Sequence, residues 1–304
     1  MLDASNEIAE RQLAVSGGGR IVNSRRSLLV TLLAFTALAI PRLHRDSQAR
    51  EQVRFLIDYS STVDRRVDHY DVAVLDANVA HPIISARRSG AIFLGYLSLG
   101  EIHSGRDYFS DAAAEGFILR PNPSWPDARF VDLRNQRWHD RVISQLVPEI
   151  LAKGFNGIFL DTLDDAEFLE RQEPARCAGM VDAAAALLRK IHQQFPGISL
   201  MVNRGYAVLP HAAGAFDMLL GESVVTTWDS ATHGYRPTSE SDAHWQIEQM
   251  RQAQRRDPKL RLFSLDYWSA DDPKGIARIY AQERVNGFIP YVGTRDLTKI
   301  VIEP

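Results

Sequence analysis

The chain has 304 residues, of which 45% are hydrophobic, so it is long enough to bury one large core. Lysine and arginine number 35 against 38 aspartates and glutamates, and the net charge of −3 excludes the strong basic field that draws proteins to nucleic acid. Cys177 is the only cysteine in the sequence, which excludes an internal disulfide framework and a cysteine metal cluster.

The first 49 residues differ in composition from the rest of the chain. Residues 1–19 are polar and end in three glycines, which predicts disorder. Arg25 and Arg26 precede an uncharged run over residues 28–40 that is shorter than a membrane span, a layout typical of a signal peptide. The paired arginines also resemble the twin-arginine export signal. We therefore expect an exported protein, periplasmic or extracellular; the alternatives are a membrane anchor formed by residues 28–40 and a buried helix.

From residue 54 onward, short β-prone runs repeatedly end in a carboxylate or an amide. Continuous apolar runs of this length are typical of strands that are buried on both faces of a parallel sheet. Eight runs share the pattern: Phe55–Asp58, Val72–Asp76, Phe93–Glu101, Phe130–Asp132, Ile158–Asp161, Leu200–Asn203, Met218–Glu222 and Leu262–Asp266.

Helical segments separate several of these runs, with the clearest at Gln136–Lys153, Ala175–Phe195 and Asp242–Arg256. Eight repeated β-α units predict a single (β/α)8 barrel of the TIM type over residues 50–304. Gly287–Val292 is a ninth strand-like run. Either it closes the barrel and an earlier run such as Phe130–Asp132 lies outside, or it is an added edge strand.

The polar strand ends are expected to meet in one cleft, because the carboxyl ends of barrel strands all lie at the same face. Paired carboxylates at such a face are the catalytic groups of glycoside hydrolysis, in which one protonates the leaving oxygen and the other attacks or activates water. The other use of such a ring is to hold a metal, but neither a calcium-loop spacing nor a His-x-x-x-His pair occurs, so no metal and no cofactor are expected.

Aromatic residues lie at or just beyond several predicted strand ends, where flat rings could stack on sugar faces. They are Tyr96, Trp125, Tyr206, Trp228, Tyr267 and Trp268. Trp138 and Trp245 fall inside predicted helices, so we expect them to pack against the sheet.

Two sequence blocks carry a resemblance to a known family. Gly95–Glu101 followed by Arg106–Phe109, and Lys153–Asp164 further along, resemble the signature blocks of glycoside hydrolase family 114. That family comprises endo-α-1,4-polygalactosaminidases and their relatives. The resemblance implies a barrel that cleaves polymers of α-1,4-linked galactosamine and N-acetylgalactosamine from within the chain.

The resemblance also implies site residues. The catalytic pair carried over from the family is Asp161 and Glu222, with Asp161 as nucleophile or base and Glu222 as general acid. The positions implied to bind sugar are Asp76, Tyr96, Glu101, Asp164, Asn203, Asp266 and Tyr267. A partly deacetylated polymer is cationic, and the chain after residue 49, with 29 basic against 34 acidic residues, is mildly acidic.

Other functions remain open at this point. The barrel could be an exported polysaccharide-binding protein without catalysis, or it could act on a different glycan. The expected partner is a polysaccharide, with membrane contact only through an uncleaved N-terminal segment, and we expect a monomer. The stereochemical outcome depends on the distance between the two carboxyl groups, which a sequence does not contain.

Overall fold

The computed structural model describes residues 52–79 and 90–304. The expected leader, signal peptide and anchor at residues 1–49 lie outside the described residues. Within the described ranges, none of the helices combines the length and the apolar character needed to span a membrane.

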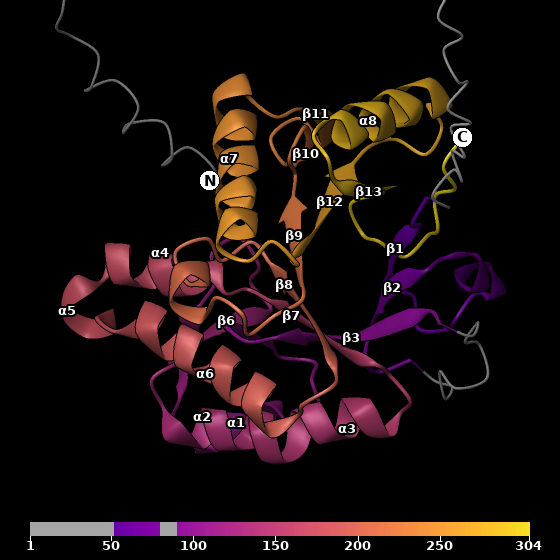
Figure 1. Ribbon diagram of the computed structural model, residues 1–304. Coiled ribbons are helices and arrows are strands. Elements are labelled where there is room, and N and C mark those ends of the chain that lie inside the picture. The colour runs from indigo at the N-terminus through magenta and orange to yellow at the C-terminus, as the bar shows by residue number, and fades with distance from the viewer. Residues whose placement is uncertain (1–51, 80–89) are drawn as a thin grey trace, which may run out of the picture. The chain divides into compact units, whose positions relative to one another are not determined.

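Eight parallel strands form one sheet that curls into a nearly closed barrel with helices around it, which confirms the (β/α)8 prediction (Figure 1). Around the barrel the strands are β1 (Phe55–Asp58), β2 (Val72–Leu75), β3 (Ile92–Ser98), β7 (Gly157–Asp161), β8 (Ser199–Asn203), β9 (Met218–Glu222), β12 (Arg261–Tyr267) and β13 (Ile289–Gly293). Strands β1 and β13 meet at the seam, where the rings of Phe55 and Tyr291 lie 6.3 Å apart.

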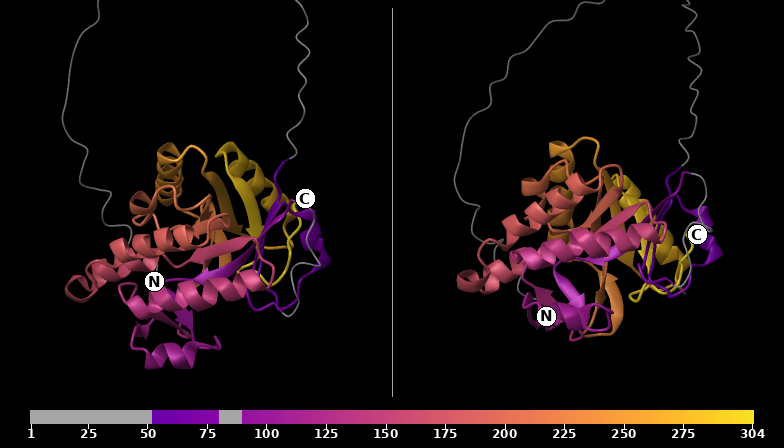
Figure 2. Two further views of the ribbon diagram at one scale, coloured as in Figure 1. Left: turned by 60° about the horizontal axis from the view of Figure 1, so that its bottom comes forward. Right: turned by 90° about the horizontal axis from the view of Figure 1, so that it is seen from below.

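The ninth strand-like run closes the barrel as β13, and the earlier run lies outside it, as one of the two alternatives predicted. That earlier run is β6 (Ala128–Val131), which pairs with β4 (Glu101–His103) and β5 (Ile118–Pro121) in a separate antiparallel sheet. This segment projects beyond the barrel strands (Figure 2). A hairpin of β10 (Thr226–Asp229) and β11 (Gly234–Pro237) follows β9.

The three predicted helical segments are present, with shifted bounds. The α-helices are α1 (Phe109–Ala114), α2 (Gln136–Arg141), α3 (Val147–Ala152), α4 (Asp164–Gln172), α5 (Pro174–Cys177), α6 (Met180–Gln194), α7 (Glu240–Arg256) and α8 (Pro273–Val285). Among the described residues, two 3-10 helices span Arg65–His69 and Leu209–Ala212, and a short π-helix at Val142–Leu146 joins α2 to α3. The predicted Ala175–Phe195 helix is divided by Gly179, whose φ of 87° cannot continue a helix.

Side chains alternate between the barrel interior and the surrounding helices along each strand. Inside, the rings of Phe55 and Phe263 lie 4.9 Å apart, edge to face. Gly157 has to be glycine, because a Cβ atom there would lie 1.8 Å from the backbone oxygen of Ser199 on β8. The same alternation decides which polar strand-end residues face the inside of the barrel.

The two tryptophans predicted to pack within helices differ. Trp138 is fully buried, and its indole nitrogen donates a hydrogen bond to the backbone oxygen of Leu99 at 3.1 Å. Its assignment to the core is confirmed. Trp245 is 53% exposed on α7 and meets the ring of Tyr206 edge on, so the expectation that it packs against the sheet is wrong.

Candidate active site

Hydrogen-bonded polar side chains from five neighbouring strands meet at the carboxyl end of the barrel. Tyr96 on β3 donates to Asp161 Oδ2 on β7 at 2.8 Å. Asn203 on β8 donates through Nδ2 to Asp161 Oδ1 at 2.9 Å and to Glu222 Oε2 on β9 at 2.7 Å. Tyr267 on β12 donates to Glu222 Oε1 at 2.6 Å. The structure therefore brings together five of the residues expected in the site.

Asn203 limits the separation of the two acids. Because one nitrogen touches Asp161 Oδ1 and Glu222 Oε2, those two oxygens are no more than about 5.6 Å apart, the sum of the two hydrogen-bond lengths. Two carboxylates this close cannot both ionise freely, because each charge opposes the other. The charge of Glu222 therefore opposes the ionisation of Asp161.

The backbone turns sharply after each of the three central residues. Thr162, Arg204 and Ser223 directly follow Asp161, Asn203 and Glu222, and their φ angles are 63°, 51° and 58°. A residue other than glycine in this left-handed region costs about 1 kcal/mol, and such residues concentrate at functional sites. Hydrogen bonds hold two of these turns, from the backbone nitrogens of Arg204 and Ser223 to oxygens on the next strand, at 2.9 and 2.8 Å.

Burial and charge set the protonation of the site. Burial, and next the charge of Glu222, raise the pKa of Asp161 from 3.8 to about 6, while hydrogen bonds from Asn203 and Tyr96 oppose that rise. Burial likewise raises the pKa of Tyr59, Tyr96 and Tyr267 well above 10. The tyrosines therefore stay protonated at neutral pH, and Tyr96 and Tyr267 can donate to the carboxylates.

We expect activity to rise as the pH rises through about 6. Asp161 is the expected nucleophile or base, and only its ionised form can act as either, so its raised pKa sets an acid limb. Measuring kcat/KM from pH 4 to 9 should show this limb near 6, and Tyr96→Phe should move the limb upward because its hydrogen bond lowers the pKa of Asp161. A limb that Tyr96→Phe leaves unmoved would contradict this assignment.

Asp76, Glu101 and Asp164 lie around the central group and not within it. Asp76 forms an ion pair with Arg106 at 3.3 Å, and the guanidinium of Arg106 lies 5.7 Å from the ring centre of Tyr96. Glu101 is buried and accepts a hydrogen bond from the side chain of Asn122. Asp164 is partly exposed at the start of α4 and lies 3.7 Å from the guanidinium of Arg204.

Asp266 lies on the opposite face of its strand from Tyr267. Its side chain has no exposed surface, and Oδ1 accepts hydrogen bonds from the backbone nitrogens of Val225 and Thr226, both at 2.8 Å. A side chain with no exposed surface cannot touch a sugar in this arrangement. The expected sugar contact of Asp266 is therefore replaced by a structural one, which holds the turn that follows Glu222.

Sequence reasoning missed several residues near the acids. The ring of Tyr59 lies 5.1 Å from that of Tyr96, and its pKa responds to both Asp161 and Glu222. Counting alternate residues could have found Tyr59, because Asp58 faces the other way and binds the Ser60 hydroxyl at 2.8 Å. No local pattern would have found Gln246, which lies on α7 and donates a 3.2 Å hydrogen bond to the backbone oxygen of Glu222.

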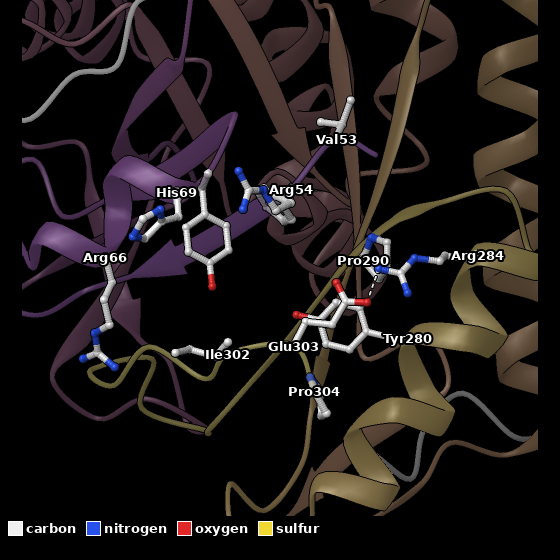
Figure 3. Close-up of a pocket in the computed structure, with 12 residues that line it drawn as sticks. Val53, Arg54, Arg66, His69, Tyr280, Arg284, Pro290, Ile302, Glu303 and Pro304 are labelled. Atoms are coloured by element: carbon white, nitrogen blue, oxygen red, sulfur yellow. Dashed lines mark ion pairs between the residues drawn. The ribbon is translucent and has the colours of Figure 1, made fainter. Parts of the chain in front are cut away.

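A pocket at the amino end of the barrel has a different character (Figure 3). Its lining includes Arg54 before β1, His69 before β2 and Pro290 in β13. Arg284 in the same lining forms an ion pair with Glu303. This pocket lies away from the paired carboxylates. Its lining has one carboxylate side chain, Glu303, so it lacks the pair of acids that the same chemistry needs.

Across residues 52–79 and 90–304, no cluster of three or more histidine, cysteine, aspartate or glutamate side chains is arranged to hold a metal ion.

Comparisons with known proteins agree with this geometry. The model of glycoside-hydrolase family GH114 matches residues 40–303. The glycoside hydrolase domain of PelA from Pseudomonas aeruginosa is 26% identical with a TM-score of 0.72, over 83% of this chain and 98% of that one. Ega3 of Aspergillus fumigatus, in complex with galactosamine, has a TM-score of 0.58 at 13% identity, over 81% and 92%, and shares the fold. An uncharacterised protein of Deinococcus radiodurans is 26% identical over 72% of this chain and 69% of its own length.

Proposed function

We propose, from the premise that this chain belongs to glycoside-hydrolase family GH114, that it cleaves α-1,4-linked polymers of galactosamine and N-acetylgalactosamine from within. Membership confirms the family resemblance of the two sequence blocks, and the class of activity is glycoside hydrolysis. The linkage, the sugar and the internal position of cleavage are the proposal.

The observation that carries the mechanism is the bridge that Asn203 makes between Asp161 and Glu222. We assign Asp161 as the nucleophile, whose carboxylate forms a bond to the anomeric carbon as the glycosidic C–O bond breaks. Glu222 gives its proton to the leaving oxygen and then takes one from the water that releases the sugar. The raised pKa of Asp161 would by itself favour the reverse assignment, so the two roles need a test that separates them.

We expect the reaction to retain the configuration of the anomeric carbon. Retaining enzymes hold their carboxyl groups about 5–5.5 Å apart, whereas inverting enzymes need about 6.5–9.5 Å to fit a water molecule. The limit of about 5.6 Å between Asp161 Oδ1 and Glu222 Oε2 favours the shorter class. Proton NMR of the first product formed, before mutarotation, should show the α anomer, and a β product would contradict the assignment.

The charge around the cleft supports an amino sugar as substrate. Asp76, Glu101 and Asp164 surround the catalytic pair, and carboxylates attract and bind ammonium groups. Arg106 and Arg204 neutralise two of these acids in part, so the cleft is suited to a polymer that is partly and not fully cationic.

The direct test is a reducing-end assay of the purified protein on partly deacetylated α-1,4-galactosaminogalactan, beside the Asp161→Asn variant. New reducing ends with the wild type alone would support both the substrate and the acid. Binding of the polymer without cleavage would favour a polysaccharide-binding barrel, and cleavage of another glycan alone would replace the proposed substrate.

A further inference from the structure

Three loops at the carboxyl end of the barrel meet at one arginine. Arg295 follows β13, and its guanidinium carbon lies 5.7 Å from the ring centre of Trp125 and 5.1 Å from that of Trp228. Trp125 lies in the connection between β5 and β6, and Trp228 lies in β10. A single cation is thus in contact with indole rings from two separate insertions in the barrel.

The arrangement is fixed by its surroundings. The backbone nitrogen of Arg295 donates to the Tyr235 hydroxyl at 3.3 Å, and the Tyr235 ring lies 5.0 Å from that of Trp228. The turn carrying Trp125 is closed by a 2.8 Å hydrogen bond from the backbone nitrogen of Ala128 to its oxygen. A binding group held in this way loses little freedom when a ligand arrives.

The guanidinium of Arg295 has N–H donors that can bind a ligand. Its guanidinium forms no ion pair or hydrogen bond with any residue in the described part of the chain, whereas Arg106, Arg204 and Arg236 each lie within 4 Å of a carboxylate. Arg295 is exposed, and Trp125 is 58% exposed although one face meets the guanidinium. An exposed indole beside a cation with free donors is suited to bind a ligand that has both an apolar face and an oxygen acceptor.

This group adjoins the proposed active site. The Tyr235 ring lies 6.4 Å from that of Trp268, and Trp268 directly follows Tyr267, which binds Glu222. Arg295 therefore adds a cationic group beside the acidic residues of the proposed site.

We propose that Trp125, Arg295 and Trp228 form a subsite that selects an N-acetylated sugar of the polymer over a sugar with a free amine. The proposal rests on the proposed function, because it assumes a galactosamine polymer in the cleft. The indole face packs against the C–H face of the sugar ring, and the guanidinium donates to the acetamide oxygen. An ammonium group at the same place meets the like charge of Arg295 and is disfavoured.

The test measures binding without turnover, in the Asp161→Asn background. Affinity electrophoresis gives the Kd for N-acetylated α-1,4-galactosamine polymer and for the same preparation after chemical deacetylation. Arg295→Gln should weaken binding of the acetylated polymer about tenfold and leave the deacetylated polymer unchanged or bound more tightly. Trp125→Ala should weaken both about fivefold, and Trp125→Tyr should restore them. Arg236→Gln, which removes the same charge from the adjoining hairpin, is the matched control.

Each outcome decides the proposal. A loss of selectivity in Arg295→Gln that Arg236→Gln does not share supports the subsite. Equal effects of the two substitutions would show that binding depends only on net charge, which would overturn the subsite. An unchanged ratio of the two Kd values in Arg295→Gln would also overturn the subsite, whereas cleavage of the polymer by the wild type would leave the proposed function standing. If the Asp161→Asn protein binds neither polymer and the wild type cleaves neither, the proposed function fails and the subsite fails with it.

Discussion

Asp161→Asn and Glu222→Gln are each expected to lower kcat by about 10³-fold or more while the fold persists. Each change keeps the shape of the side chain and removes the group that exchanges a proton or attacks the sugar. Asn203 can still donate to either amide oxygen, so the hydrogen-bonded arrangement loses little. Initial rates on the polymer, with circular dichroism to verify folding, provide the measurement.

Asp132→Asn is the matched control for these substitutions. Asp132 also directly follows a strand, but it pairs with Arg134 at 2.8 Å outside the barrel, so its loss should change kcat less than twofold, by roughly the small effect of a surface ion pair. Wild-type kcat in Asp161→Asn or Glu222→Gln would remove that residue from the mechanism.

Shorter variants separate the two roles. Asp161→Gly and Glu222→Ala both leave space for azide in place of the carboxylate. If Asp161 is the nucleophile, azide should rescue Asp161→Gly with a β-glycosyl azide, and Glu222→Ala with an α-glycosyl azide. The reverse pattern of products would exchange the two assignments.

Glu283→Ala is expected to destabilise the protein by about 3 kcal/mol, because it leaves the buried carboxyl group of Asp266 without its partner. Glu283 on α8 and Asp266 on β12 are both fully buried and hydrogen-bonded to each other. Burial, and next the charge of Asp266, raise the pKa of Glu283 to about 9, so Glu283 keeps its proton at neutral pH and donates it to Asp266. Asp266 in turn holds Val225 and Thr226 after Glu222.

Glu283→Gln is the informative partner of that variant, because an amide still donates to Asp266. It should keep most of the wild-type stability at pH 7. The folded protein keeps a proton on Glu283 that the unfolded chain releases near the ordinary glutamate pKa, so the free energy of unfolding of the wild type should fall as pH rises from about 4.5 toward 9. Urea unfolding at pH 5, 7 and 9 should show a smaller fall in Glu283→Gln. Equal falls in both proteins would contradict the shared proton.

Much of the fold followed from the sequence because its signals are local. All nine predicted runs proved to be strands, eight of them parallel strands of the barrel and one, β6, an antiparallel strand outside it. The position of Asp161 and Glu222 at strand ends also followed, since barrel strands present their carboxyl ends at one face. The family resemblance then separated these two acids from the other acidic strand ends.

Tertiary structure decided what depends on distance and on facing. Asp266 and Tyr267 are adjacent in sequence, yet the pleat of β12 turns Tyr267 to Glu222 and Asp266 to Glu283. Which run closes the barrel depends on pairing between strands that are far apart in the sequence. The distance between the carboxyl groups of Asp161 and Glu222 depends on Asn203, which lies between them. The sequence by itself determined the strands, their polar ends and the family, because those are properties of short segments. Only the packed barrel decided which ends face one another, because side-chain direction and separation arise when distant strands pair.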